Sequence, residues 1–308
     1  MVNLYRLQFF PILKSYLKVN DNMKPKIDLQ NPIIKEAMSI YQTNVLNALN
    51  AEQTVEKAVV PIYHISDKKF KLEQIASGVI VNIKDEYFIL SASHVFDQIG
   101  KYALCIGVEP GKEVLQLPGE RFSSPKGESG THNDDAIDAS AYHITGDVPE
   151  SIKKLSITMD VFDTESSENN INIVYLASGF RVKKSNTKGN AVYSKKEAFP
   201  SCEITDKSYE ILNLDSNMYV ILNFEEQNLI EGKWQLSPTP RGFSGGAIIK
   251  VIPTETETGV VYKQKLTGII TEHRKKNKQK NIDGVLIGTR INVHLAAIEK
   301  FLPELFSE

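Results

Sequence analysis

The sequence predicts a mainly β protein, with a helical segment before the β body and another after it. Short apolar runs rich in Val, Ile and Tyr recur from about residue 59 onwards, and most are bounded by Gly, Pro, Asn or Asp. Such runs are typical of antiparallel barrels or sandwiches. Strand and helix patterns do not alternate, which argues against a parallel α/β fold. Apolar residues at helical spacing occupy residues 31–51 and 293–305.

The first helix, over residues 31–51, has Pro32 near its first turn and Ile33, Ala37 and Tyr41 four residues apart. Strands are predicted over 59–65, 78–83, 87–90, 102–108, 139–144, 171–177, 218–224, 247–252, 265–271 and 285–291. The polar residues 84–86 predict a hairpin turn between two of them. The last helix carries an apolar stripe on one face.

Composition excludes several classes of protein. The 308 residues include 36 basic and 38 acidic side chains, so the formal charge of -2 gives no global attraction to nucleic acid or to an anionic membrane. Cys105 and Cys202 have no Cys or His neighbours at metal-ligand spacing. We therefore expect no zinc site, no disulfide scaffold and no cofactor, and free thiols in a reducing, cytoplasmic compartment.

Two further segments have competing interpretations. Residues 4–17 are rich in Leu and Phe, but Arg6, Pro11 and Lys14 interrupt them before they reach signal-peptide or membrane-span length. We expect an extension that packs on the body, with no membrane role. The basic run at residues 274–280 has no interleaved aromatic residues. A solvated hairpin loop is therefore favoured over a nucleic-acid or acidic-partner site.

A polar, acidic stretch at residues 163–170 divides the strand-rich region into two parts of comparable length. We interpret this stretch as a linker. The predicted organisation is a helical extension over residues 1–54, a first β unit over 55–165, and a second β unit with the C-terminal helix over 166–308.

The most informative segment is Gly242-Phe243-Ser244-Gly245-Gly246. Glycines around a serine let the backbone turn sharply and leave N–H groups pointing into open space. The amides of Gly242 and Ser244 would then form an oxyanion hole, while Ser244 Oγ attacks a carbonyl carbon. Most glycine-serine clusters, however, are flexible turns. The assignment therefore depends on companion residues.

A serine hydroxyl needs a positioned base to remove its proton. Among the six histidines, His94 follows the apolar run 87–90 and is preceded by small residues, so it would lie accessibly at a strand end. A lone histidine in a β protein is more often structural. Its pairing with the serine loop favours the role of general base.

A carboxylate should orient the imidazole. Asp134, Asp135 and Asp138 are the candidates, and we choose Asp138 because it directly precedes the predicted strand 139–144, which would hold it firmly. Asp134 and Asp135 are more typical of solvated loop charges. The alternative for Asp138 is a turn residue at the strand start.

The order His94, Asp138, Ser244 is that of the chymotrypsin-like, or trypsin-like, serine peptidases. Ala-Ser-His-Val at 92–95 resembles that family's Thr-Ala-Ala-His pattern, and Asp-Ala-Ser-Ala at 138–141 resembles its Asp-Ile-Ala-Leu pattern. The serine loop is similar to its Gly-Asp-Ser-Gly-Gly loop. The resemblance implies two six-stranded antiparallel β-barrels over residues 55–300, with His94 and Asp138 in the first barrel and Ser244 in the second. It also implies a serine endopeptidase that acts on protein or peptide substrates.

Other residues refine the resemblance. Phe243 stands where digestive members carry the aspartate that pairs with a newly cut N-terminus, so that route of activation is not expected. With few cysteines and no signal peptide, the chain resembles the intracellular bacterial trypsin-like peptidases, of which the HtrA proteases are distant relatives. Thr267, Gly268 and Ile269 are similar to the strand that pairs with substrate backbone. Residues 237–241, which include Arg241, should line the first specificity pocket and contain no carboxylate, so a strict preference for Arg or Lys is not expected. Glu272, just past the substrate strand, is the alternative source of a carboxylate.

Two alternatives to an active peptidase stay open at this stage. The first is a catalytically silent or latent pseudopeptidase of the same fold that binds an extended peptide. The second is an unrelated β-sandwich interaction module, which would require His94, Asp138 and Ser244 to lie far apart. Because an intracellular protease must be restrained, regulation by a protein partner is a further hypothesis.

Overall fold

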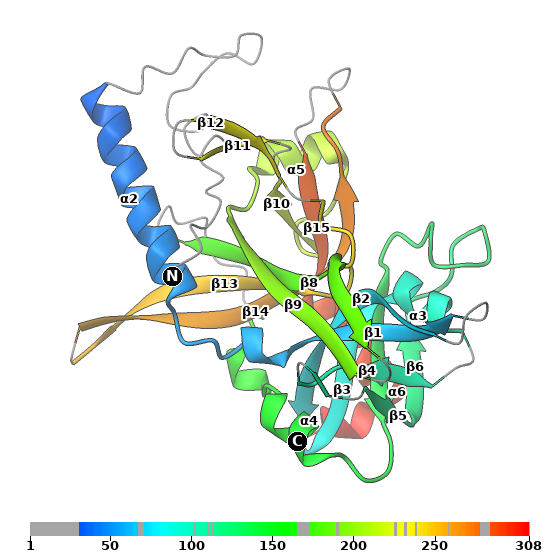
Figure 1. The fold of residues 1–308 in the computed structure, drawn as a ribbon. Coiled ribbons are helices and arrows are strands. Elements are labelled where there is room, and N and C mark those ends of the chain that lie inside the picture. Colours follow the sequence, from blue (N-terminus) through cyan, green and yellow to red (C-terminus); the bar gives the residue numbers. More distant parts are fainter. Residues whose placement is uncertain are drawn as a thin grey trace.

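A computed structural model describes residues 31–66, 71–100, 103–109, 111–112, 114–164, 173–188, 191–224, 227–230, 233–237, 239–257, 259–277 and 284–307. The apolar segment 4–17, most of the proposed linker 163–170 and the basic residues 278–280 lie outside this description. The described chain is dominated by two antiparallel sheets, with short helices around them (Figure 1). The expectation of a mainly β protein is confirmed.

Helix α2, Pro32–Leu49, lies where the sequence predicts the first helix, and it projects from the β body in Figure 1. Asn31 caps it, because its side chain accepts a hydrogen bond from Ile33 N at 2.9 Å. Tyr41 and Val45, at helical spacing, are buried where the helix contacts strands β8 (Val174–Lys188) and β9 (Ala191–Ser201).

The first sheet has the strand order β5-β4-β1-β2-β3-β7-β6. Its strands are β1 (Val59–Ser66), β2 (Lys71–Ile83), β3 (Glu86–Ala92), β4 (Leu104–Ile106), β5 (Leu115–Leu117), β6 (Gly119–Ser123) and β7 (Ala139–Ile144). The two edge strands, β5 and β6, are consecutive in the chain and separated only by Pro118, which lacks an N–H group for a ladder. One interrupted strand therefore closes the sheet, and the seven segments correspond to the six strands expected.

The turn between β2 and β3 is formed by Lys84 and Asp85, both with positive φ, 48° and 68°. Two such residues make the two-residue hairpin turn whose twist matches that of the flanking strands. Ile83 pairs with Glu86 across it, so the hairpin lies where the sequence predicted one.

The second sheet has the order β10-β15-β14-β13-β8-β9. Besides β8 and β9 it contains β10 (Tyr219–Asn223), β13 (Ala247–Thr256), β14 (Gly259–Arg274) and β15 (Val285–Arg290). Beyond β9 the chain returns to the far edge, where Glu203 bridges to Leu222 and Ile204 N donates to Ile221 O at 2.9 Å. This contact closes the second sheet. Strands β11 (Gln227–Ile230) and β12 (Lys233–Leu236) form a separate pair.

Short helices surround the sheets: η1 (Glu56–Ala58), α3 (Ser93–Ile99), α4 (Glu150–Leu155), η2 (Met159–Val161), α5 (Asp206–Leu212), α6 (Ile291–Phe301) and η3 (Pro303–Leu305). The C-terminal helix α6 follows the second sheet in sequence but also contacts β6 and β7 of the first. The ring of Phe301 stacks on Phe122 with 4.7 Å between centroids. The last helix therefore returns to the first sheet.

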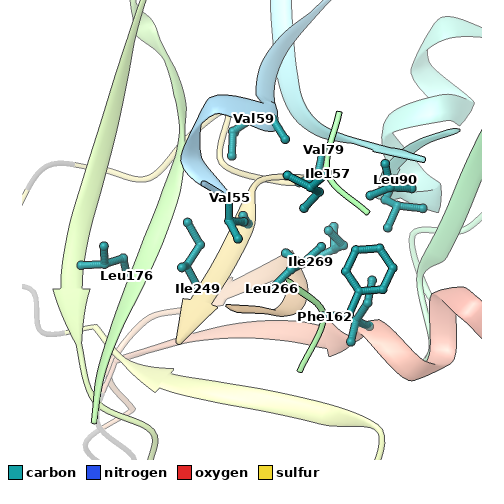
Figure 2. Close-up of a cluster of buried hydrophobic side chains, with 14 of the residues drawn as sticks. Val55, Val59, Val79, Leu90, Ile157, Phe162, Leu176, Ile249, Leu266 and Ile269 are labelled. Carbon is teal, nitrogen blue, oxygen red and sulfur yellow. The ribbon is translucent and has the colours of Figure 1, made fainter. Parts of the chain in front are cut away.

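The main hydrophobic core is shared by the two sheets (Figure 2). Val79 and Leu90 come from the first sheet, whereas Ile249, Leu266 and Ile269 come from the second. All five side chains are fully buried. No helix in the described part of the chain is both long and apolar enough to cross a membrane.

Candidate active site

His94 and Asp138 meet because β3 and β7 pair. Ala92, the last residue of β3, lies opposite Ala139, the first residue of β7. The residues just outside this pair are therefore neighbours. His94 Nδ1 lies 2.6 Å from Asp138 Oδ2, and the backbone N–H of His94 donates to Asp138 Oδ1 at 2.9 Å. With both carboxylate oxygens engaged, Asp138 fixes the position and the orientation of the imidazole.

Local backbone geometry supports this contact. Asp138 has φ of 51°, in the left-handed region that Asp adopts more readily than most residues. Its carbonyl accepts from Ser93 N at 3.2 Å. His94 lies in the first turn of α3 rather than in a loop after the strand. Asp134 and Asp135, the alternatives to Asp138, instead accept hydrogen bonds within their own loop and the adjoining Ser124.

Ser244 shares a cleft with His94, on a loop whose shape requires glycine. Gly242 and Gly245 have φ of 99° and 80°. A Cβ atom on Gly242 would lie 2.5 Å from Phe180 O, and one on Gly245 would lie 2.0 Å from Ser77 O. Both the backbone conformation and the close approach therefore exclude larger residues.

The amides of this loop fall into two groups. Those of Phe243, Gly245 and Gly246 donate to the carbonyls of Pro240, Ile270 and Phe243. Within the described residues, the amides of Gly242 and Ser244 donate to no protein group. These are the two N–H groups that the sequence predicts for an oxyanion hole, and both residues line the cleft.

Within the described part of the protein, the hydroxyl of Ser244 has no hydrogen-bond partner and makes no hydrogen bond to His94. Ser244 and His94 line one cleft, but no hydrogen bond joins the serine hydroxyl to the imidazole. Catalytic hydrogen bonds are often long in ligand-free sites and shorten when substrate binds.

Phe243 anchors the serine loop in the hydrophobic core of the second sheet. It is only 1% exposed, and its ring lies 5.2 Å from that of Phe199 between centroids. It also packs closely against Gly179. An apolar contact thus occupies the position at which digestive peptidases of similar sequence pattern carry an aspartate.

The cleft has a volume of about 720 Å³ and is lined by residues of both sheets. His94, Gly242 and Ser244 lie in it, together with the exposed Arg241, which was predicted to contact substrate. The sequence did not predict two further histidines of the lining, His64 of β1 and His273 of β14. Nothing in their local sequence distinguishes them, because they reach the cleft only through the arrangement of the strands.

The prediction that Thr267, Gly268 and Ile269 pair with substrate is wrong. They lie at the centre of β14, where Gly268 pairs with Ile248 on one side and Arg290 on the other, and all three are buried. Both edges of this segment are already used by the sheet. The ladder to β13 ends at Ile269, and residues 271–274, which follow, reach the cleft at His273.

The remaining histidine, cysteine and metal-ligand candidates do not add a second reactive site in the described chain. His132 Nδ1 lies 2.8 Å from Asp97, and its Nε2 lies 3.0 Å from Ser124 O. Cys105 and Cys202 are free, and burial raises the pKa of both thiols, that of Cys202 to about 11, so neither is an activated nucleophile. No three His, Cys, Asp or Glu side chains of the described chain are grouped to bind a metal ion.

Comparison with known proteins gives a likeness in structure alone. No family model and no curated protein matches the sequence. Solved structures do match, among them neuropsin, a serine protease expressed in the limbic system of mouse brain. The alignment covers 82% of this chain and 97% of neuropsin, with a TM-score of 0.50 and 11% identity. The fold is chymotrypsin-like. This excludes the unrelated β-sandwich module.

Proposed function

We propose that this protein is a serine endopeptidase that cleaves peptide bonds through an acyl-enzyme on Ser244. The observation that carries the proposal is the hydrogen bond of His94 to Asp138 in the cleft that also holds Ser244. The backbone amides of Gly242 and Ser244, which donate to no described protein group, support the proposal further.

The chemistry follows from the roles of these groups. His94 Nε2 accepts the proton of Ser244 Oγ as the oxygen attacks the scissile carbonyl carbon, and the amides of Gly242 and Ser244 stabilise the oxyanion. His94 then gives the proton to the leaving amine. A water molecule hydrolyses the acyl-enzyme by the reverse sequence of proton transfers. Asp138 keeps the proton of the imidazole on Nδ1 and stabilises the cation that forms.

The substrate class is an extended polypeptide. We infer that its backbone runs along the edge of β14 at residues 271–274 and passes Arg241 at the rim of the cleft. Residues 239–241, which border the cleft, contain no carboxylate, whereas Glu73 lines the same cleft and Glu272 lies on the proposed substrate edge. The absence of a strict preference for Arg or Lys therefore stays a prediction from the sequence. Cytoplasmic location, control by a protein partner and likeness to intracellular bacterial peptidases stay predictions from the sequence.

A fluorophosphonate probe tests the proposal, because it reacts only with an activated serine. Wild-type protein should be labelled at Ser244 and should cleave a denatured protein or a peptide library, and Ser244→Ala should abolish both. If the folded wild-type protein is not labelled at Ser244 and cleaves no substrate, the proposed peptidase activity is excluded.

The open contact between Ser244 and His94 favours one second candidate, a latent or silent pseudopeptidase that binds extended peptides in the same cleft. This candidate predicts saturable peptide binding to the wild-type protein without labelling at Ser244. Labelling that appears only when a partner is added would indicate the latent form.

A further inference from the structure

A serine of the first sheet reaches across to the loop that carries Ser244 in the second. Ser77 lies on β2 and is fully buried. Its backbone N–H donates to Ser244 O at 2.9 Å, and its hydroxyl donates to Gly242 O at 2.8 Å. The same hydroxyl accepts from Phe180 N at 2.9 Å. Ser77 therefore holds the loop at two carbonyls and ties it to β8.

The bond to Gly242 O acts next to a residue whose backbone rotates easily. Glycine permits many backbone conformations, so the peptide groups on either side of Gly242 can rotate unless something holds them. Val182 N donates to Arg241 O at 3.1 Å, which fixes the peptide group before Gly242. Two hydrogen bonds hold the peptide group after it: Phe243 N donates to Pro240 O at 2.9 Å, and Ser77 Oγ donates to Gly242 O at 2.8 Å. With both groups held, the Gly242 N–H is fixed in orientation, and Gly242 lines the cleft.

The surroundings leave no substitute for the hydroxyl. A Cβ atom on Gly179 would lie 3.2 Å from Ser77 Oγ, and the carbonyl of Ser77 itself accepts from Ser91 Oγ at 3.0 Å. A hydroxyl-sized gap is too small for a water molecule. Removing Ser77 Oγ would thus leave Gly242 O and Phe180 N unpaired in a buried site.

We propose that Ser77 is a positioning residue that orients the oxyanion hole from the opposite sheet. The inference rests on the proposed function. It implies that the proposed catalytic geometry depends on the contact between the two sheets.

The test compares Ser77→Ala with Ser178→Ala. Ser178, on β8, is equally buried, but its hydroxyl has no hydrogen-bond partner within the described structure. Fluorophosphonate acylation is measured over a range of probe concentrations, and turnover of p-nitrophenyl acetate is divided by the number of labelled sites. Ser77→Ala should lower the maximal rate per site about 10- to 100-fold, since removing an oxyanion donor outright costs 10²–10³. Half-saturation should change by less than about 3-fold.

The outcomes separate the possible failures. Ser178→Ala should match wild type, and Ser77→Thr, which keeps the hydroxyl, should regain part of the rate. A Ser77→Ala protein with fewer labelled sites but an unchanged rate per site would assign Ser77 a structural role only and overturn the inference while leaving the peptidase intact. A folded wild-type protein that does not react would overturn the proposed function and this inference with it.

Discussion

Replacing Phe243 by alanine should destabilise the protein strongly, although the residue lies beside the nucleophile. The ring is buried to 1% exposure and packs on Phe199 at 5.2 Å. Truncating a buried phenylalanine costs about 3–5 kcal/mol, from the lost burial and the cavity that remains. Native proteins are stable by only about 5–15 kcal/mol, so this loss is a large fraction of the total.

Urea unfolding followed by circular dichroism measures the effect, with Phe301→Ala as the matched control. Phe301 also stacks on a phenylalanine, Phe122, but is 48% exposed, and its loss should cost about 1 kcal/mol. Equal losses for Phe243→Ala and Phe301→Ala, or a loss below about 1 kcal/mol for Phe243→Ala, would refute the idea that an apolar anchor holds the serine loop.

Two further predictions concern histidines. Asp138→Asn places an amide donor against His94 Nδ1, so the imidazole proton should move to Nε2. Labelling of Ser244 at pH 7 should then slow by about 10⁴-fold. An unchanged labelling rate would show that Asp138 does not set the tautomer of His94. Burial lowers the pKa of His294 from 6.5 to about 4. Because the unfolded chain then binds a proton that the folded one does not, stability should fall by about 3 kcal/mol as pH drops from 6.5 to 4. Thermal melts of His294→Leu should lack this part of the pH dependence, and identical profiles for both proteins would contradict it.

Strand positions followed well from apolar patterning where the strands are buried on both faces. The strand predicted over 139–144 is β7, with the same bounds. Strand β9 was missed because its sequence is charged, with Lys195, Lys196 and Glu197 in succession. Lys196 is half-buried there, and its ammonium group donates to Glu56 O, a contact between residues far apart in sequence. Only the tertiary structure supplies that partner.

In the candidate site, too, some residues could be predicted from local sequence and others only from tertiary structure. Ser244 was predicted from its glycines, which the backbone needs at positive φ, and Asp138 from its place before a strand. The substrate-pairing role of Thr267 rested on the resemblance of its segment to a substrate-binding strand, and a local resemblance does not show which part of a strand has a free edge. His64, His273 and Ser77 could not be found, since their roles depend on how β1, β2 and β14 face the serine loop.

The core shared by the two sheets limits how this protein could be taken apart. Val79 and Leu90 on one side and Leu266 and Ile269 on the other cover each other's apolar surface (Figure 2). A half expressed alone would expose that surface to water and would tend to aggregate. A half exchanged with a distant relative would present a mismatched surface to its new partner. The two barrels are therefore not interchangeable modules, and they must change together in evolution and in design.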